Sequence, residues 1–336
     1  MPNDKPVLVT GASGFVGSHT ARLLVQRGRK VRVLVRKTSN LDAMRGLPVE
    51  VYYGDVLEPD SVRAATDGCS SVFYSVVDPR FWLSDPTPLY RNNVEGLVNA
   101  MDVALASGVE HFIFTSTMGT LGFNPDGPVT EDIAFNWRDK ASAYILARVQ
   151  AEERFMEYCH DRGLPGVALC VANTYGPQDY QPTPHGNMLW QVGSGRTKRV
   201  MDTSAPMVDI RDVAAAALAA EKSGRIGERY IIANEYISNR DFFTMAAQWG
   251  GHEPPRFISQ RAAAIVASVA EVFIKLFGIK DSMLSKDAVF LSGAFKEMDN
   301  SKARRELHWN PRPVRETVND ALAWYAQQEA EKSGKA

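Results

Sequence analysis

The chain has 336 residues, a length that exceeds one ordinary core and suits two lobes. Its hydrophobic content of 45% and formal net charge of −1 are typical of a globular protein and give no reason to expect a nucleic acid or a membrane surface as partner. Its three cysteines are odd in number and lack zinc-binding spacing, so we expect reduced thiols, a cytoplasmic location and no metal.

The first half of the chain alternates short β-branched runs with helical segments. Apolar strands separated by helices predict parallel β-α-β units, and hence an α/β, Rossmann-type, doubly wound sheet. We expect strands at 6–10, 30–36, 49–54, 71–77, 111–117, 166–172 and 228–233. Glycines at the ends of the helical segments predict left-handed closing residues at Gly28, Gly68, Gly108 and Gly163.

The alternation stops after Pro177, where a proline-rich loop begins and mostly helical patterns follow. We therefore predict a dinucleotide-binding domain over 1–177, to which 205–234 returns, and a mainly substrate-binding, mostly helical lobe over 178–336. Such a lobe usually closes a cleft at the carboxyl edge of the sheet. The most apolar later stretch, 262–278, carries Glu271 and Lys275, so it predicts an amphipathic helix and no membrane span.

The segment TGASGFVG follows the first expected strand and opens the first expected helix. Gly11 suits the tight turn, Gly14 permits a close approach of the backbone to a pyrophosphate, and Gly17 permits close packing of helix on strand. Free N–H groups at the helix N-terminus favour phosphate there. The alternative is a glycine-rich turn without a ligand.

The second expected strand ends in Arg36 and Lys37, where an NAD enzyme often places a carboxylate for the ribose 2′-hydroxyl. Cations suit a 2′-phosphate, so we favour NADP over NAD. Arg36 is otherwise a solvated residue at a strand end. Asp55 and Val56 follow the third strand and are expected beside the adenine, unless they only turn the chain into the next helix.

These features resemble the extended short-chain dehydrogenase/reductase family, which includes epimerases and dehydratases. The likeness spans nearly the whole chain, and within the family it is similar to the branch of dihydroflavonol-4-reductase-like, 3β-hydroxysteroid dehydrogenase-like and hopanoid-associated epimerase proteins. Its markers are the glycine motif 11–17, Gly54-Asp55, Thr115-Ser116-Thr117, Tyr144 with Arg148, Tyr175-Gly176-Pro177 and the segment 208–214.

The resemblance implies a catalytic hydroxyl, a tyrosine acid/base and a cation that binds the nicotinamide ribose. Thr117, with Ser116 as reserve, matches the hydroxyl and Tyr144 matches the tyrosine. Arg148 stands where the family has lysine; four residues separate it from Tyr144, so the two share a helix face. The alternatives are a strand-end Thr117, a core-packed Tyr144 and an Arg148 paired with Glu152.

The resemblance also implies the rest of a cofactor strip. Its members are Ser13, Phe15, Val16, Val76, Val77, Asn93, Thr115, Asn173 and Tyr175. Asn93 is expected to support the active site, unless it is a simple helix N-cap. Val76 and Val77 replace the usual small residues, and Val171 replaces a common proline, so the departures gather at the nicotinamide end.

Large apolar residues in the expected cleft favour a hydrophobic or aromatic small-molecule substrate. The candidate substrate residues are Arg80, Phe81, Trp82, Phe123, His185, Met188 and Trp190. We predict an NADP-dependent carbonyl reductase or secondary alcohol dehydrogenase. The alternatives are a nucleotide-sugar epimerase or dehydratase, with a cationic cleft from Arg196, Lys198, Arg199 and Arg211, and a non-catalytic NADP-binding protein.

The resemblance further implies a homodimer through helices near 92–107 and 142–161, with Ala141, Ala143, Ala147 and Ala151 permitting close approach.

Overall fold

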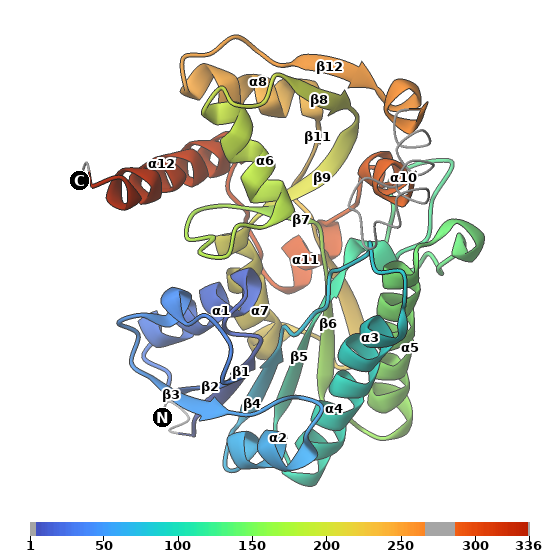
Figure 1. Ribbon diagram of the computed structural model, residues 1–336. Coiled ribbons are helices and arrows are strands. Elements are labelled where there is room, and N and C mark those ends of the chain that lie inside the picture. The colour runs from blue at the N-terminus through green and yellow to red at the C-terminus, as the bar shows by residue number, and fades with distance from the viewer. Residues whose placement is uncertain (1–4, 266–285, 335–336) are drawn as a thin grey trace.

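A computed structural model describes residues 5–265 and 286–334, and its larger lobe is built on seven parallel strands (Figure 1). The order across the sheet is β10-β6-β5-β4-β1-β2-β3. The strands are β1 Val7–Thr10, β2 Val31–Val35, β3 Val49–Tyr53, β4 Ser71–Tyr74, β5 His111–Thr117, β6 Gly166–Val171 and β10 Glu228–Ile232. The expected α/β, doubly wound fold is confirmed, with each expected strand present and β4 shorter than predicted.

Helices cover both faces of this sheet because alternate residues of each strand are apolar on opposite sides. Val7, Val9 and Phe73 pack toward one face, while Leu8, Val72 and Tyr74 pack toward the other. The first face holds α1 Phe15–Gln26 and α7 Ile210–Ser223; the second holds α2 Pro59–Thr66, α3 Thr87–Tyr90, α4 Gly96–Ala106 and α5 Ala143–Asp161. Strand order reverses at β1 and β4, where α/β sheets open a binding crevice.

The smaller lobe lies above the carboxyl ends of these strands in Figure 1 and contains more β-structure than the sequence indicated. One small sheet has the order β11-β9-β7 and the other pairs β12 with β8. Their strands are β7 Asn173–Tyr175, β8 Arg199–Asp202, β9 Ser204–Asp209, β11 Glu235–Ser238 and β12 Arg256–Ser259. The helices are α6 Pro184–Gly193, α8 Asn239–Trp249, α10 Lys286–Ala294 and α12 Val314–Lys332, whereas α11 Ser301–Glu306 packs against β10 of the main sheet. Runs this short lack the periodicity by which strands are predicted.

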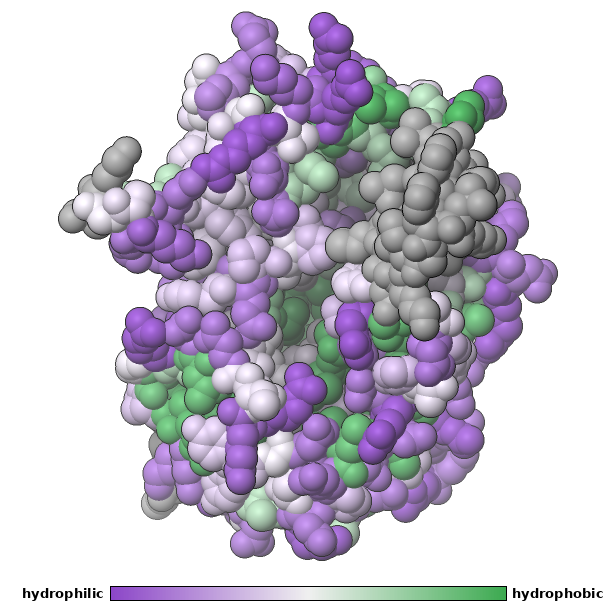
Figure 2. Space-filling view, in the orientation of Figure 1, coloured by the Kyte–Doolittle hydropathy of each residue, from purple (hydrophilic) through white to green (hydrophobic). Residues whose placement is uncertain are grey.

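Two further sequence expectations concern helix ends and apolar segments. The four closing glycines all have positive φ, between 63° and 74°. No helix in the described ranges is both long enough and apolar enough to cross a membrane. Residues 260–265 are helical, and the rest of the predicted 262–278 helix lies outside the described residues. Figure 2 shows this face hollowed between the lobes, with hydrophobic residues at the floor of the recess.

Candidate active site

The loop between β1 and α1 is shaped by backbone contacts that exclude side chains. Gly11 has φ +71°, and a Cβ on it would lie 2.6 Å from the Ser75 carbonyl oxygen. A Cβ on Gly17 would lie 2.3 Å from the Gly11 carbonyl oxygen. Glycine is therefore needed at position 11 for the turn and at position 17 for helix-on-strand packing.

Gly14 is explained less well by contacts within the protein. A Cβ there would approach only the Gly11 carbonyl oxygen, at 3.3 Å. Gly14 is also the N-cap of α1, which has no side-chain cap and no acidic residue in its first turn. Ser13, Phe15 and Val16 complete the turn, and no side chain caps the positive end of the helix dipole at Gly14. This arrangement fits a dinucleotide pyrophosphate.

The smaller lobe contacts this loop directly. Gln181, in the proline-rich segment after β7, donates from Nε2 to the Ser13 carbonyl oxygen at 2.8 Å. That segment is anchored in turn by Asp179, whose Oδ2 accepts from Tyr325 of α12 at 2.7 Å and from the Thr183 backbone at 2.8 Å. Burial raises the pKa of Asp179 above its usual value. Gln181 thus ties the anchored segment to the phosphate loop.

At the adenine end, Arg36 and Lys37 are exposed immediately after β2. Neither forms an ion pair with any residue in the described ranges. Asp55 lies in a turn closed by Ser61, which donates to its carbonyl oxygen and accepts from its N–H. Val56 is buried beneath Gly96. The turn into α2 is therefore present. A position of Asp55 beside the adenine of a bound cofactor stays a prediction.

The end of β5 separates the two candidate hydroxyls. Ser116 is buried and donates to the Glu152 carboxylate, so its proton is already committed. Thr117 is half-buried and accepts from the Gly119 N–H at 3.2 Å. Because Thr117 uses only an acceptor position there, its own O–H is left to donate. The preceding Thr115 hydroxyl bonds instead to the Ser75 hydroxyl, at 2.9 Å.

Tyr144 lies in the first turn of α5, which begins at the Ser142 N-cap. It is half-buried and packs against the apolar cluster of Trp137, Ile145 and Val149. Burial raises the pKa of its phenol above the usual value, Arg148 acts to lower it, and Asp78 acts to raise it. The net result is a phenol that holds its proton firmly.

Arg148 is 1% exposed and does not reach open solvent. Its Nη2 donates to the Thr115 carbonyl oxygen at 2.7 Å, and its guanidinium lies 5.1 Å from the centre of the Phe114 ring. The Nε and Nη1 groups are buried without a hydrogen-bond partner in the described structure. The expected alternative pairing with Glu152 is wrong, because Glu152 pairs with Arg229 at 2.9 Å.

Asn93 organises the loop after β4 and does not cap a helix. Its Oδ1 accepts from the Asp78 N–H at 3.0 Å, and its Nδ2 donates to the Asp78 carbonyl oxygen at 3.1 Å. Asn93 is fully buried in a π-helical turn, Arg91–Glu95, between α3 and α4. Such turns are frequent at functional sites. The N-cap interpretation is therefore wrong, and a supporting role beside the site remains.

The structure gives Arg80 a protein partner that the sequence did not indicate. Arg80 binds the Asp78 carboxylate with Nε at 2.7 Å and with Nη2 at 2.5 Å. Asn92 donates to the same carboxylate at 2.8 Å. This buried carboxylate influences the charge around Tyr144.

The predicted substrate residues lie in three groups. Phe123 stacks on Trp137, with ring centres 4.7 Å apart, beside Tyr144. Phe81 and Trp82 form an edge-on pair at 5.1 Å in the loop after β4. His185, Met188 and Trp190 come from α6; His185 lies 5.8 Å from the Tyr175 ring, Met188 is 40% exposed, and Trp190 stacks on Tyr325.

Sequence reasoning missed the aromatic wall on which Phe123 rests. This wall consists of Phe123, Phe135, Trp137, Phe290 and Phe295, with ring centres 4.7 to 6.2 Å from Trp137. The Trp137 indole N–H donates to the Leu121 carbonyl oxygen at 2.9 Å, which fixes the ring. Its members come from segments far apart in sequence, so only the density of aromatic residues in 123–137 could have indicated it.

The remaining predicted cofactor residues lie at the carboxyl edge of the sheets. Val76 is half-buried and Val77 is 46% exposed, both directly after β4. Asn173 and Tyr175 belong to β7, and Tyr175 is buried against Phe242 at 4.7 Å. Tyr175 therefore supports the smaller lobe, and Asn173 is half-buried.

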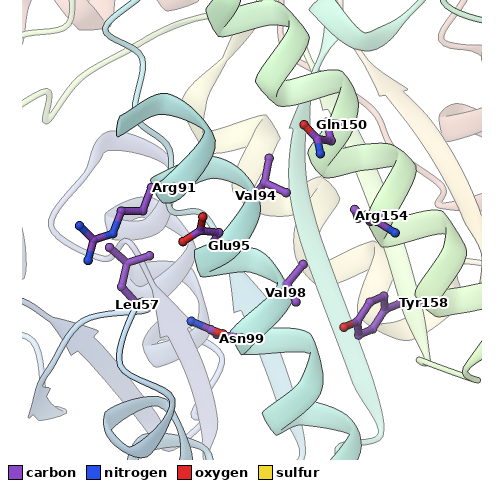
Figure 3. Close-up of a pocket in the computed structure, with 9 residues that line it drawn as sticks. All are labelled: Leu57, Arg91, Val94, Glu95, Val98, Asn99, Gln150, Arg154 and Tyr158. Atoms are coloured by element: carbon purple, nitrogen blue, oxygen red, sulfur yellow. The ribbon is translucent and has the colours of Figure 1, made fainter. Parts of the chain in front are cut away.

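A separate groove lies between α4 and α5 on the outside of the molecule (Figure 3). It is lined by Val94, Val98, Gln150, Arg154 and Tyr158, among others. Gln150 follows Arg148 by two residues, which places it on the opposite side of α5 from Tyr144 and Arg148. This groove is therefore no part of the candidate active site.

The comparisons with known proteins agree with this geometry. Residues 7–233 match the model of the NAD dependent epimerase/dehydratase family. Sterol demethylase protein B of Methylococcus capsulatus is 29% identical over 95% of this chain and 98% of its own. Cinnamoyl-CoA reductase 1 of Oryza sativa subsp. japonica is 29% identical over 71% of this chain and 74% of its own. The crystal structure of gox2253 superposes with a TM-score of 0.86 and 35% identity, covering 97% of this chain and 99% of that one.

Proposed function

The chain belongs to the NAD dependent epimerase/dehydratase family, and from that membership we propose that it is an NADP-dependent carbonyl reductase or secondary alcohol dehydrogenase. Its substrate is a hydrophobic or aromatic ketone, or the matching alcohol. The observation that carries the proposal is the position of Tyr144, whose half-buried phenol adjoins the aromatic wall. The names of the reductases among its relatives support the same chemistry.

In the proposed mechanism, the substrate carbonyl oxygen lies between Tyr144 and Thr117. When bound, the nicotinamide supplies the hydride. Tyr144 donates its proton to the oxygen as the carbon is reduced, and the Thr117 hydroxyl donates a hydrogen bond to that oxygen. Arg148 adds a positive charge near the phenol and opposes the rise in its pKa. The glycine loop would hold the pyrophosphate, and Arg36 with Lys37 would hold the 2′-phosphate.

Charge in the smaller lobe argues against the alternative of a nucleotide-sugar epimerase or dehydratase. A sugar diphosphate requires free cations in the cleft. Arg211 is already bound to Asp209 and Asp320, each at 2.7 Å, and Arg196 is paired with Glu329. Two of the four cations considered for that role are therefore neutralised.

The non-catalytic alternative, an NADP-binding protein, is favoured by one specific observation. Arg148 is buried and bonded to Thr115, so it does not project into the open recess as a ribose ligand would. A protein that binds NADPH without turnover fits this geometry. The experiment must therefore separate binding from reduction.

We also propose a cytoplasmic homodimer formed by α4 and α5, with the groove of Figure 3 in its seam. One detail of the sequence expectation is wrong: Ala147 and Ala151 are fully buried within the chain, so they cannot admit a partner helix. Val98 and Gln150, which line the groove, are better placed for contact. Light scattering at micromolar concentration tests this seam, and a monomeric mass contradicts it.

The activity itself is tested by NADPH oxidation with a panel of aryl ketones, steroid ketones and flavonoids, beside a titration of NADPH alone. Reduction of at least one apolar ketone, with NADPH preferred over NADH, is the expected result. Binding without reduction of any ketone supports the non-catalytic alternative. Firm retention of NAD together with binding of a nucleotide sugar supports the epimerase.

A further inference from the structure

Glu152 is a buried carboxylate directly behind the candidate catalytic residues. It follows Arg148 by one helical turn and Tyr144 by two, so the three share a side of α5. Its side chain is 6% exposed. Its Oε2 accepts from the Ser116 hydroxyl and, at 3.6 Å, from the Cys170 thiol. The Thr120 hydroxyl lies 2.8 Å from this oxygen and 2.8 Å from the Thr117 carbonyl oxygen, so it bridges the two. Ser116 and Thr120 flank Thr117, so one carboxylate oxygen holds both sides of the turn that carries the catalytic hydroxyl.

The second oxygen of Glu152 binds Arg229, which comes from β10 at the edge of the sheet. The Nη1–Oε1 distance is 2.9 Å. The same guanidinium donates from Nε to the Glu131 carbonyl oxygen at 2.7 Å and from Nη2 to the Ile133 carbonyl oxygen at 3.1 Å. Residues 131–133 lead directly into Phe135 and Trp137 of the aromatic wall. Arg229 therefore holds the base of that wall as Glu152 holds the catalytic turn.

A buried ion pair is expensive unless further hydrogen bonds satisfy both partners. Here the carboxylate accepts from the Ser116 hydroxyl and the Cys170 thiol and shares the Thr120 hydroxyl, besides binding Arg229. The guanidinium donates to two carbonyl groups besides Glu152. A fully satisfied polar network of this kind fixes a unique geometry. The ion pair thus anchors two separate segments: Glu152 holds the turn after β5, and Arg229 holds the loop before Trp137.

We propose that Glu152 and Arg229 are a pair of positioning residues for ketone reduction. Glu152 sets the distance from the Thr117 hydroxyl to Tyr144, and Arg229 sets the distance from the aromatic wall to Tyr144. The inference rests on the proposed reductase function and adds to it a division of labour. Glu152 acts on the chemical step, whereas Arg229 acts on the fit of the apolar substrate.

The test compares Glu152→Gln and Arg229→Lys with Glu157→Gln, a control on the exposed side of the same helix. Steady-state reduction of an aryl ketone is measured beside hydrogen exchange of the backbone amides. Glu152→Gln should lower kcat by about 10- to 100-fold with KM nearly unchanged, because a small misplacement of a catalytic group is costly. Arg229→Lys keeps the charge but loses the paired carbonyl contacts, so it should raise KM by about tenfold with little change in kcat.

Hydrogen exchange supplies the readout that does not depend on turnover. Glu152→Gln should accelerate exchange at 117–121, and Arg229→Lys should accelerate it at 131–137, with neither effect in Glu157→Gln. A common loss of activity that tracks the folded fraction, with KM unchanged in both variants, overturns the division of labour. If Glu152→Gln does not fold, Ser116→Ala and Thr120→Val remove its donors singly and must each lower kcat; unchanged kcat in both overturns the inference.

The two proposals fail in different ways. A wild-type chain that reduces no ketone contradicts the reductase proposal. The hydrogen-exchange data alone then test whether Glu152 and Arg229 anchor two separate segments. Separate acceleration in the two segments supports two anchored units. Equal or absent acceleration in both segments overturns the pair.

Discussion

The two ends of the proposed cofactor strip differ in how far protein contacts explain their residues. At the phosphate loop, Gly11 and Gly17 are required by contacts under 3 Å, and Gly14 leaves the helix N-terminus open to an anion. At the nicotinamide end, Arg148 is buried with two nitrogen atoms unpartnered in the described structure. Steric contacts thus account for the residues at the binding end, whereas contacts within the protein leave part of the cation at the reactive end unexplained.

The largest expected effect lies at the reactive end. Tyr144→Phe removes the proton donor and keeps the ring in the aromatic cluster, so turnover should fall by about 10³-fold or more. NADPH affinity should change by less than about threefold, since the glycine loop is untouched. Loss of ketone reduction with unchanged NADPH affinity would show that the reactive end can fail while the binding end still works. Near-normal ketone reduction by Tyr144→Phe contradicts the mechanism.

Thr117 gives the next largest effect. Thr117→Ala should lower kcat by about 10²-fold, the usual loss for one donor to a developing oxyanion. Thr117→Ser keeps the hydroxyl and should lower kcat only a few-fold. The matched control is Thr66→Ala, whose buried hydroxyl bonds to the Val62 carbonyl oxygen within α2. Equal losses in Thr117→Ala and Thr117→Ser would show that the methyl group matters and not the hydroxyl.

Arg36→Asp tests the binding end. Losing a charge-assisted contact to a 2′-phosphate should weaken NADPH binding by about ten- to a hundredfold, which is about 1.5–3 kcal/mol. NADH affinity should hold or improve, because a carboxylate suits the 2′-hydroxyl. Titrations with both cofactors measure the ratio; an unchanged ratio places the 2′-phosphate elsewhere.

The smallest expected effect is an increase in kcat. Arg148→Lys should keep NADPH affinity within about twofold and raise kcat a few-fold, because a compact ammonium concentrates its charge. Burial raises the pKa of Tyr144, so alcohol oxidation, which needs the phenolate, should increase with pH up to and beyond the usual tyrosine range. Lysine should move that rise to lower pH. An identical pH–rate profile in the wild-type chain and in Arg148→Lys would show that the residue at position 148 does not influence the pKa of the Tyr144 phenol.

The sequence predicted what local pattern encodes and missed what distant contacts create. The sheet, the helix-closing glycines and the phosphate loop follow from periodicity and from backbone sterics. Glu152 lies in the charged run Glu152-Glu153-Arg154, which is typical of an exposed helix, yet its partner Arg229 is 77 residues away. Trp137 was equally hidden, because its importance depends on Phe290, which approaches from a distant segment of the chain.

The π-helical turn at Arg91–Glu95 makes this part of the chain sensitive to length more than to composition. The turn holds one residue more than an α-helix would, and that extra residue brings Asn93 against Asp78. Deleting a single residue there would restore regular α-helix and rotate α3 by about 100° relative to α4. An in-frame codon loss in 91–95 would therefore disturb the loop beside Tyr144, whereas most exchanges of side chain at exposed Arg91 would leave it in place.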